Sequence, residues 1–544
     1  MMKRKNRSSW ARTAIIYHIY PLSFKDSNSD GKGDLKGILE KLDYLNDGTE
    51  KSLGVNAIWL SPVYCSPMAD FGYDVSDYYE IDPVFGDLEI FEELVREVHG
   101  RGMKILMDFI PNHTSAQHPW FLESRVSRDN PKRNWYIWQN PKPNGAPPNN
   151  WLSCFGRSAW TYDEKTQQYY LHSFFPEQPD LNWRNLQVQK EMRKVLQFWL
   201  ARGVDGFRVD AISHIMIDEQ LRDDPPNPNY VPGAINPYES LLHIYSKERP
   251  ELQEVLNTLC EVLDQKEDRF MVSEAYVDIP GLMALHQACK NGLHAPMNLN
   301  FIEMPWNAQV YRRFIDDFEK SLSPDDIPVH VLGNHDRSRI ATRLGQQKAR
   351  LAALLIFTLQ GIPLVYYGEE IGMEDEEIPE EKIQDPLDKR IPGFKLGRDP
   401  ARTPMQWSAH KYAGFSDALP WLPIGRNYKT HNVEDERKDS SSMFNLYRNL
   451  IHYRKKSPIL LYGSYESIDP GNNEIVAFLR KFDREQILVA LNFSQEEQPL
   501  SLHFSQARVI YSTCFDREPG EMVTLGKFRL KPYEGVMYRY YRRI

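Results

Sequence analysis

The stretch GVDGFRVDAISH, residues 203–214, is where the reading of this chain begins. Phe207, Val209 and Ile212 give it the apolar character of a buried strand, yet Arg208 and Asp210 stand two residues apart inside it. Because side chains alternate along a strand, both charged groups point to the same side. Taken alone, the stretch is read equally well as a structural ion pair or as part of a functional site.

Composition excludes several classes of protein. The chain has 544 residues, a net charge of −9, 41% hydrophobic and 26% charged residues, which suits a globular protein of more than one domain. The net negative charge does not favour binding to nucleic acid. The sequence contains no apolar run of about 18 residues, so no transmembrane helix is predicted. The sequence gives no indication of oligomeric state.

The cysteines and the start of the chain bear on location. Five scattered cysteines without metal-ligand spacing favour a reduced, cytoplasmic protein. The basic residues 1–10 are followed by an apolar stretch that is too short for a signal peptide.

Short apolar runs that end in polar residues recur eight times. They are residues 14–20, 55–61, 104–110, 206–212, 270–276, 297–302, 328–336 and 363–370. Segments of helical character, such as 91–102, 189–203 and 346–361, lie between most of them. Strands that alternate with helices predict parallel βαβ units, and eight units predict an α/β fold of the (β/α)₈ TIM-barrel type, whose active site lies at the C-terminal strand ends.

Two regions depart from the alternation. Residues 112–184 form a connection too long for a simple loop, and we interpret them as a subdomain inserted after strand 3. Period-two strands from about residue 459 predict a C-terminal antiparallel β-sandwich domain. The expected organisation is therefore a barrel in two parts (1–111 and 185–458), the insertion (112–184) and the β domain (459–544).

Seven motifs in order carry a resemblance to a known family. They are GVNAIWLSP (54–62), DFIPNH (108–113), QPDLNW (178–183), GFRVDA (206–211), VSEA (272–275), LGNHD (332–336) and GIPLVYYGEE (361–370). Together they resemble the α-amylase family, glycoside hydrolase family 13. QPDLNW and GRDPARTPMQW (397–407) are similar to its α-glucosidase and oligo-1,6-glucosidase branch.

The resemblance gives the catalytic roles. It implies that Asp210 is the nucleophile, Glu274 the acid/base and Asp336 the carboxylate that stabilises the transition state. Arg208 is then expected to keep Asp210 ionised, since a neighbouring cation favours the charged form. Three acids that converge in one pocket are poor structural design but suit a site where positive charge develops, so this reading outweighs the ion pair.

The resemblance also implies substrate contacts. His113 and His335 match substrate-binding histidines, and Tyr73 matches the aromatic residue that stacks on the terminal sugar. Asp70 and Arg402 match the pair that closes the pocket around the non-reducing end. Two further aromatic residues line the same pocket or belong to the core of the long insertion, and the sequence leaves both readings open: Phe155 and Phe174.

The loop DSNSDGKGD (26–34) predicts a structural Ca²⁺ site. Oxygen ligands are spaced as in a calcium loop at Asp26, Asn28, Asp30, Lys32 (through its carbonyl) and Asp34. Gly37 stands where an EF-hand has its closing glutamate, so a calcium sensor is not expected. The match is to the structural metal loop of this family branch, and the alternative is an Asx-rich turn without metal.

The expected function is an exo-acting, retaining α-glucosidase that releases glucose from maltose and short maltooligosaccharides. The alternatives are a glucosyltransferase or isomerase of the same family (trehalose synthase-like or sucrose-splitting) and an enzyme that prefers α-1,6 links. Ala211 directly follows the expected nucleophile. In this family branch, a small residue at this position is associated with preference for α-1,4 links, and valine is associated with preference for α-1,6 links. Arg157 replaces a usual glycine and places a cation near the pocket mouth. A catalytically inactive binding subunit is disfavoured because all three carboxylates are present.

Overall fold

The computed structural model describes residues 10–233, 236–289, 294–391, 394–500, 502 and 506–540. Its centre is a closed barrel of eight strands in the order β1-β13-β12-β11-β10-β9-β5-β2, and each recorded pair of neighbours is parallel. The strands are β1 Ile16–Ile19, β2 Ala57–Leu60, β5 Lys104–Phe109, β9 Gly206–Val209, β10 Phe270–Ser273, β11 His294–Asn298, β12 Val329–Val331 and β13 Ile362–Tyr366. The predicted TIM barrel is confirmed.

Seven of the eight predicted strands fall where the sequence placed them, and the sixth is shifted. The run 297–302 contains only the end of β11, which stops at Asn298, and the helix α9 Asn300–Glu303 begins two residues later. The Asn298 side chain accepts a hydrogen bond from the backbone N–H of Asn300 at 3.2 Å. Such an asparagine turn competes with strand continuation, which the apolar pattern does not reveal.

Helices surround the barrel and turn an apolar stripe towards it. In α4 (Leu88–Gly100) the buried residues Phe91, Leu94, Val95 and Val98 recur with helical spacing. The other long helices are α6 Leu186–Ala201, α7 Leu252–Leu263, α8 Ile279–His286, α10 Ala308–Ser321, α12 Gln346–Thr358 and α15 Met443–Lys456. The short ones are α1 Pro21–Phe24, α2 Leu35–Glu40, α3 Leu42–Leu45, α5 Pro119–Ser124, α11 Ile340–Leu344, α13 Leu387–Arg390, α14 Val433–Glu436 and α16 Pro458–Tyr462.

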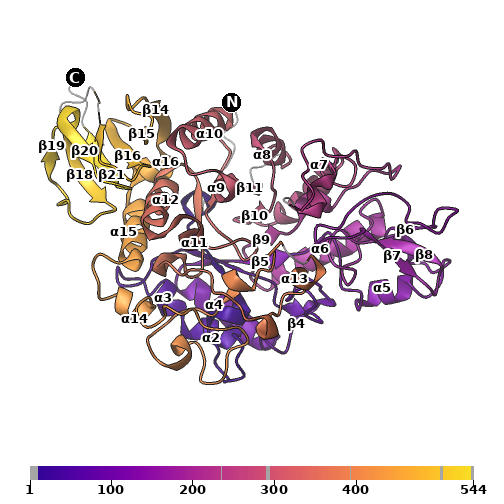
Figure 1. Cartoon of the computed structure of the whole chain (residues 1–544). Coiled ribbons are helices and arrows are strands. Elements are labelled where there is room, and N and C mark those ends of the chain that lie inside the picture. The colour runs from indigo at the N-terminus through magenta and orange to yellow at the C-terminus, as the bar shows by residue number, and fades with distance from the viewer. Residues whose placement is uncertain are drawn as a thin grey trace.

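The insertion between β5 and β9 builds its own small sheet, with antiparallel order β6-β8-β7. Its strands are β6 Trp138–Gln139, β7 Trp160–Asp163 and β8 Gln168–Leu171, and a separate pair, β3 Tyr64–Cys65 and β4 Asp77–Ile81, lies after β2. The two ends of the insertion lie side by side, because His113 and Asp180 form an antiparallel bridge. Figure 1 shows the β6-β8-β7 sheet on the side of the barrel opposite the C-terminal strands.

The C-terminal region contains two antiparallel sheets, β14-β15-β16-β21-β18-β19 and β17-β20. Their strands are β14 Ser464–Ile468, β15 Ile475–Phe482, β16 Glu485–Asn492, β17 Gln498–Leu500, β18 Ala507–Ser512, β19 Met522–Val523, β20 Phe528–Leu530 and β21 Gly535–Tyr540. The buried Arg480 of β15 joins this region to the barrel, because it donates to the carbonyl of Thr358. Close by, the buried Arg454 of α15 donates to the carbonyls of Phe357 and Leu359. These bonds satisfy carbonyl groups that the end of α12 leaves unpaired.

The cysteines differ from the sequence prediction. Cys260 of α7 and Cys289, after α8, form a disulfide with Cα atoms 6.1 Å apart, whereas all five cysteines were expected to be reduced. The separation of 29 residues between the two cysteines does not predict a disulfide. The two thiols come together only because α7 packs against the turn after α8. Within the described ranges, no helix is both long and apolar enough for a membrane span.

Candidate active site

One buried arginine organises the carboxylates at the C-terminal end of the barrel. Arg208, 1% exposed on β9, donates from Nη1 to Asp210 at 2.6 Å and to Asp108 at 2.8 Å. Its Nη2 donates to Glu274 at 2.6 Å. Both readings of 203–214 therefore hold: Arg208 and Asp210 are an ion pair, and the pair is part of a larger cluster of acids.

The strand ends fix the two predicted catalytic acids in place. The backbone N–H of Asp210 bonds to the carbonyl of Phe109, and that of Glu274 bonds to the carbonyl of Val209. A shared guanidinium keeps their carboxylates close together, in line with the separation of about 5–5.5 Å that retaining glycosidases use. Ala211, next to Asp210, has a φ of 47° and turns the chain sharply at the cavity wall.

Tyr73 is oriented by Asp108, the first residue of the motif DFIPNH (108–113). The Asp108 carboxylate accepts hydrogen bonds from the Tyr73 hydroxyl at 3.0 Å and from Trp59 Nε1 at 3.2 Å. The Tyr73 ring stacks on His335 with ring centroids 5.2 Å apart. Tyr73 and His335 therefore form one wall of the cavity, as a platform for a sugar ring requires.

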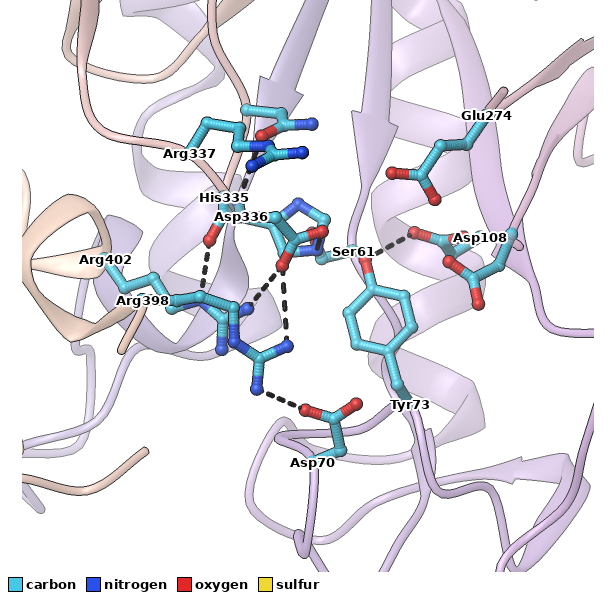
Figure 2. A network of polar contacts seen from close by, with 12 residues as sticks. Ser61, Asp70, Tyr73, Asp108, Glu274, His335, Asp336, Arg337, Arg398 and Arg402 are labelled. Atoms are coloured by element: carbon cyan, nitrogen blue, oxygen red, sulfur yellow. Dashed lines mark hydrogen bonds and ion pairs between the residues drawn. The ribbon is translucent and has the colours of Figure 1, made fainter. Parts of the chain in front are cut away.

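A second network surrounds Asp336, and it corrects one expectation (Figure 2). Arg402 does not pair with Asp70; it donates to Asp336 at 2.8 Å and to the carbonyl of His335 at 2.8 Å. The partner of Asp70 is Arg398, at 2.7 Å, and Arg398 also reaches Asp336 at 3.5 Å. Both arginines belong to one motif, four residues apart, so the sequence alone could not assign the pairing.

His113 is joined to this network through a residue that the sequence analysis did not select. Gln178 Nε2 lies 3.0 Å from His113 Nε2 and donates to Asp70 at 3.0 Å. Gln178 opens the motif QPDLNW, so the motif itself was the signal that could have found it. Asp180 of the same motif binds Asn112 at 3.0 Å and holds the two ends of the insertion together.

One cavity of about 470 Å³ is lined by Asp70, Tyr73, His113, Gln178, Asp210, Glu274, His335, Asp336 and Arg398. Arg208 and Arg402 are not in its lining and act on it through the carboxylates that they bind. Phe155 and Phe174 both line it, which resolves the open choice between pocket and core in favour of the pocket. The remaining lining comes largely from the loop after β9 and from the ends of β10 to β12: Ala211, Ser213, His214, Asn236, Tyr238, Glu239, Lys247, Glu248, Ala275, Tyr276, Glu303 and Arg337. The loop after β9 had been noted, but which of its side chains face the cavity depends on its folded path.

Arg157 is not part of the cavity lining, and its expected place near the pocket mouth stays a prediction. It is exposed, with a φ of 66°, and is not among the residues that line the cavity, although Phe155 two positions earlier is. A positive φ is the conformation in which glycine is free of strain, which accounts for glycine at this position in related sequences. Arg157 therefore lies outside the pocket wall.

The electrostatics divide the acids into two kinds. Burial raises the pKa values of Asp210 and Glu274 to about 7 each; Arg208 opposes this rise, and the charge of Asp336 adds to it. Arg208 was expected to keep Asp210 ionised; it does favour the charged form, but burial and the neighbouring carboxylates oppose it and leave the pKa of Asp210 raised. Burial also acts on Asp336, but His335, Arg402 and Arg398 outweigh it and hold its pKa well below the ordinary value.

The two histidines predicted to bind substrate, His113 and His335, are neutral. Burial lowers the pKa of His113 to about 3, and burial together with the neighbouring arginines lowers that of His335 well below its ordinary value. A neutral imidazole both donates and accepts, so each ring can bind a sugar hydroxyl without bringing a further charge into the site.

The predicted calcium loop is closed by its own hydrogen bonds. Asp26 accepts from Ser416 and from the N–H groups of residues 28, 29 and 31, and Asp34 accepts from the N–H groups of residues 27 and 37. Among the described residues, no three His, Cys, Asp or Glu side chains are grouped as metal ligands. The donors are oxygen atoms, which suits Ca²⁺, but the turn is satisfied without one, so Ca²⁺ stays a prediction.

Comparison with known proteins agrees with the geometry. Residues 18–463 match the model of the alpha amylase catalytic domain, and residues 465–536 match that of the maltogenic amylase C-terminal domain. A probable alpha-glucosidase of Rhizobium meliloti (strain 1021) is 40% identical, with 90% of each chain covered. An oligo-1,6-glucosidase of Parageobacillus thermoglucosidasius is 36% identical over 97% of this chain and 99% of its own. The crystal structure of the alpha-glucosyl transfer enzyme XgtA superposes with a TM-score of 0.91 at 37% identity, covering 98% of this chain and 99% of its own.

The barrel and its clustered carboxylates define a glycoside hydrolase, for which the retaining mechanism is general in this fold family. The chain belongs to the α-amylase family, glycoside hydrolase family 13.

The first prediction concerns the two carboxyl groups nearest Arg208. Asp210→Asn removes the nucleophile and should lower kcat by about 10⁴-fold or more, with the fold intact by circular dichroism. Glu274→Gln should cost about 10²–10⁴-fold on maltose, and much less on a p-nitrophenyl glucoside, whose leaving group departs without a proton. Near-normal turnover by Asp210→Asn would contradict the whole assignment.

The second prediction concerns pH. Since Glu274 must carry the proton that the leaving group takes, kcat/KM should fall as pH rises through about 7, where Glu274 loses that proton. It should also fall on the acid side, where Asp210 becomes protonated. In Glu274→Gln, measured on a p-nitrophenyl glucoside, the alkaline decline should disappear. A wild-type profile that stays level well above neutral pH would contradict the assignment of Glu274 as the proton donor.

The third prediction concerns metal. If residues 26–34 bind Ca²⁺ only in the native state, Ca²⁺ at 100 times its Kd stabilises the fold by about 2.7 kcal/mol and raises Tm. EDTA should lower Tm, and Asp30→Ala should abolish the response without changing kcat. An unchanged melting curve, with no calcium in the chelated protein by elemental analysis, would show that the loop is an Asx turn without metal.

Proposed function

We propose that the protein is an exo-acting, retaining α-glucosidase that removes terminal non-reducing α-1,4-linked glucose from maltose and short maltooligosaccharides. The observation that carries this proposal is the closed end of the cavity. Asp70, Arg398 and Asp336 are joined by ion pairs there, across from Glu274 (Figure 2). A terminal glucose fits between the two groups, whereas a longer chain has no way through the buried pairs.

The residues present support a double displacement. Asp210 attacks the anomeric carbon while Glu274 gives its proton to the leaving oxygen, and Glu274 then takes a proton from the incoming water. Asp336 stays ionised and stabilises the positive charge that develops on the sugar. Tyr73 and Phe174 present ring faces to the cavity, and His113 and His335 offer neutral hydrogen-bonding groups.

A second candidate keeps the same covalent intermediate and passes the glucosyl unit to another sugar. The likeness to a solved alpha-glucosyl transfer enzyme supports a glucosyltransferase or isomerase of this family as the alternative, including trehalose synthase-like and sucrose-splitting activities. The likeness to an oligo-1,6-glucosidase supports a preference for α-1,6 links in the same way.

The mode of attack gives the direct test. Maltotriose should yield glucose and maltose in equal amounts at early times, and soluble starch should lose viscosity slowly, because only chain ends enter the closed cavity. Transfer would appear as products longer than the substrate. Rapid internal cleavage of starch would contradict an exo-acting enzyme.

Linkage preference tests the role of Ala211, which lines the cavity directly after Asp210. Valine there adds two methyl groups towards a directly attached second ring, while an α-1,6 link carries a CH₂ that swings that ring away. Discrimination of this size is worth about 1–3 kcal/mol, so kcat/KM for maltose should exceed that for isomaltose by about tenfold or more. Ala211→Val should narrow or reverse the ratio.

The ratio of kcat/KM for maltose to that for isomaltose is the quantity to measure. A β-branched residue is strained at the φ of 47° found at Ala211, and this strain should lower the rates on both sugars together. Ala211→Ser, which adds no branch, serves as the control and should keep the preference for maltose. Equal rates on the two disaccharides, unchanged in Ala211→Val, would show that this residue does not set linkage.

A further inference from the structure

Arg398 is the cation on which the closed end of the cavity depends. It is 7% exposed and lines the cavity, and its guanidinium meets three carboxylates. Two of them, Asp70 at 2.7 Å and Asp336 at 3.5 Å, face the cavity. The third, Asp385, is fully buried and is not part of the cavity lining.

The contact with Asp385 is the most complete of the three. Arg398 donates to it from Nε at 2.7 Å, from Nη2 at 3.1 Å and from its own backbone N–H at 2.8 Å. A two-pronged bond of this kind fixes the plane of a guanidinium, which a single contact does not. With Nε held by Asp385, the remaining N–H groups of Arg398 are aimed at Asp70 and Asp336.

Asp385 is itself held in place by the chain around it. Its carboxylate accepts the N–H of Leu387 at 3.0 Å, and Asp399 accepts the N–H of Asp385 at 2.9 Å. Neither Asp385 nor Asp399 is recorded in contact with Asp210, Glu274 or Arg208. The Arg208 cluster, on β5, β9 and β10, is therefore built independently of residues 385–399.

Charge gives Asp385 a second reason to be present. Arg402 also donates to Asp336, at 2.8 Å, so two buried guanidinium groups approach one carboxylate. Two like charges at one buried site repel each other, and a buried cation is stable only when it is paired. Asp385 supplies the additional negative charge on the side of Arg398 that faces away from the cavity.

We propose that Asp385 is a positioning residue which, by orienting Arg398, sets the affinity of the cavity for the terminal glucose. This inference rests on the proposed function, because it assigns the closed end of the cavity to that sugar. It predicts an effect on ground-state binding and leaves the chemistry of the Arg208 cluster in place.

The test is a set of variants assayed with maltose and with glucose as a competitive inhibitor. Asp385→Asn keeps the size and shape of the side chain, but it removes the negative charge and replaces one acceptor oxygen with an NH₂ group that cannot accept a hydrogen bond from Arg398. KM for maltose and Ki for glucose should each rise by about tenfold or more, while kcat stays within about threefold, as for lost uniform binding. Asp385→Glu keeps the charge and should restore part of both affinities.

Glu376→Gln is the matched control. Glu376 lies in the same part of the chain, is 9% exposed, and pairs with Arg426 at 2.6 Å, away from the cavity. Its loss removes an ion pair to an arginine that is 73% exposed and remote from the cavity, so Glu376→Gln should keep wild-type KM and Ki. Equal shifts in Glu376→Gln and Asp385→Asn would reduce Asp385 to a structural role and overturn the inference.

Unchanged KM and Ki in Asp385→Asn would also overturn it. If that variant does not fold, Asp385→Glu decides: a folded protein with normal Tm, KM and Ki would refute the positioning role. Failure of the proposed function is distinct, because the wild type would then hydrolyse no α-glucoside. Calorimetric binding of glucose to wild type and variant still tests Asp385 in that case, and a wild type that binds no glucose would overturn the inference.

Discussion

The site depends on a single buried guanidinium. Arg208 contacts Asp108, Asp210 and Glu274, and without it three carboxylates in one desolvated space would repel one another and take up protons. With it, burial still raises the pKa values of Asp210 and Glu274, so both carboxyl groups bind a proton more readily than they would in water. An acid and a nucleophile are what a retaining glycosidase needs from two chemically similar groups, and one cation placed between them provides both.

The rest of the cavity divides by structural origin. The groups of the Arg208 cluster stand on or directly after β5, β9 and β10, in the closed hydrogen-bonded barrel. The groups that surround the terminal sugar come from connecting segments: Asp70 from the turn after β3, Gln178 from the insertion and Arg398 from the segment after β13. A rigid barrel thus carries the chemistry, while segments free to vary in length carry recognition, which is how one fold serves many substrates.

The sequence predicted what strand periodicity and motif order determine. The barrel and the carboxylates Asp210, Glu274 and Asp336 follow from both, because acids at the ends of neighbouring parallel strands must meet. The pairing of Asp70 with Arg398 instead of Arg402 was not predictable, since both arginines stand in one motif and only the fold decides which guanidinium turns where. The disulfide and Asp385 were missed for the same reason: each depends on a contact between segments, and neither residue type at that spacing indicates a partner.

The two ends of the cavity differ in how firmly they hold a sugar. On the donor side Asp70, Arg398 and Arg402 are buried and paired at short range, so a misplaced hydroxyl leaves a charge unsatisfied and is rejected strongly. On the leaving-group side the pairs are Arg337 with Glu303 at 2.9 Å and Lys247 with Glu248 at 3.4 Å, and all four side chains are about a quarter to a half exposed. Exposed pairs contribute about 0–1 kcal/mol and rearrange readily. If the proposed function holds, a site built this way binds the terminal sugar strictly and the leaving group loosely, and the exposed side decides whether water or a second sugar takes the transferred unit.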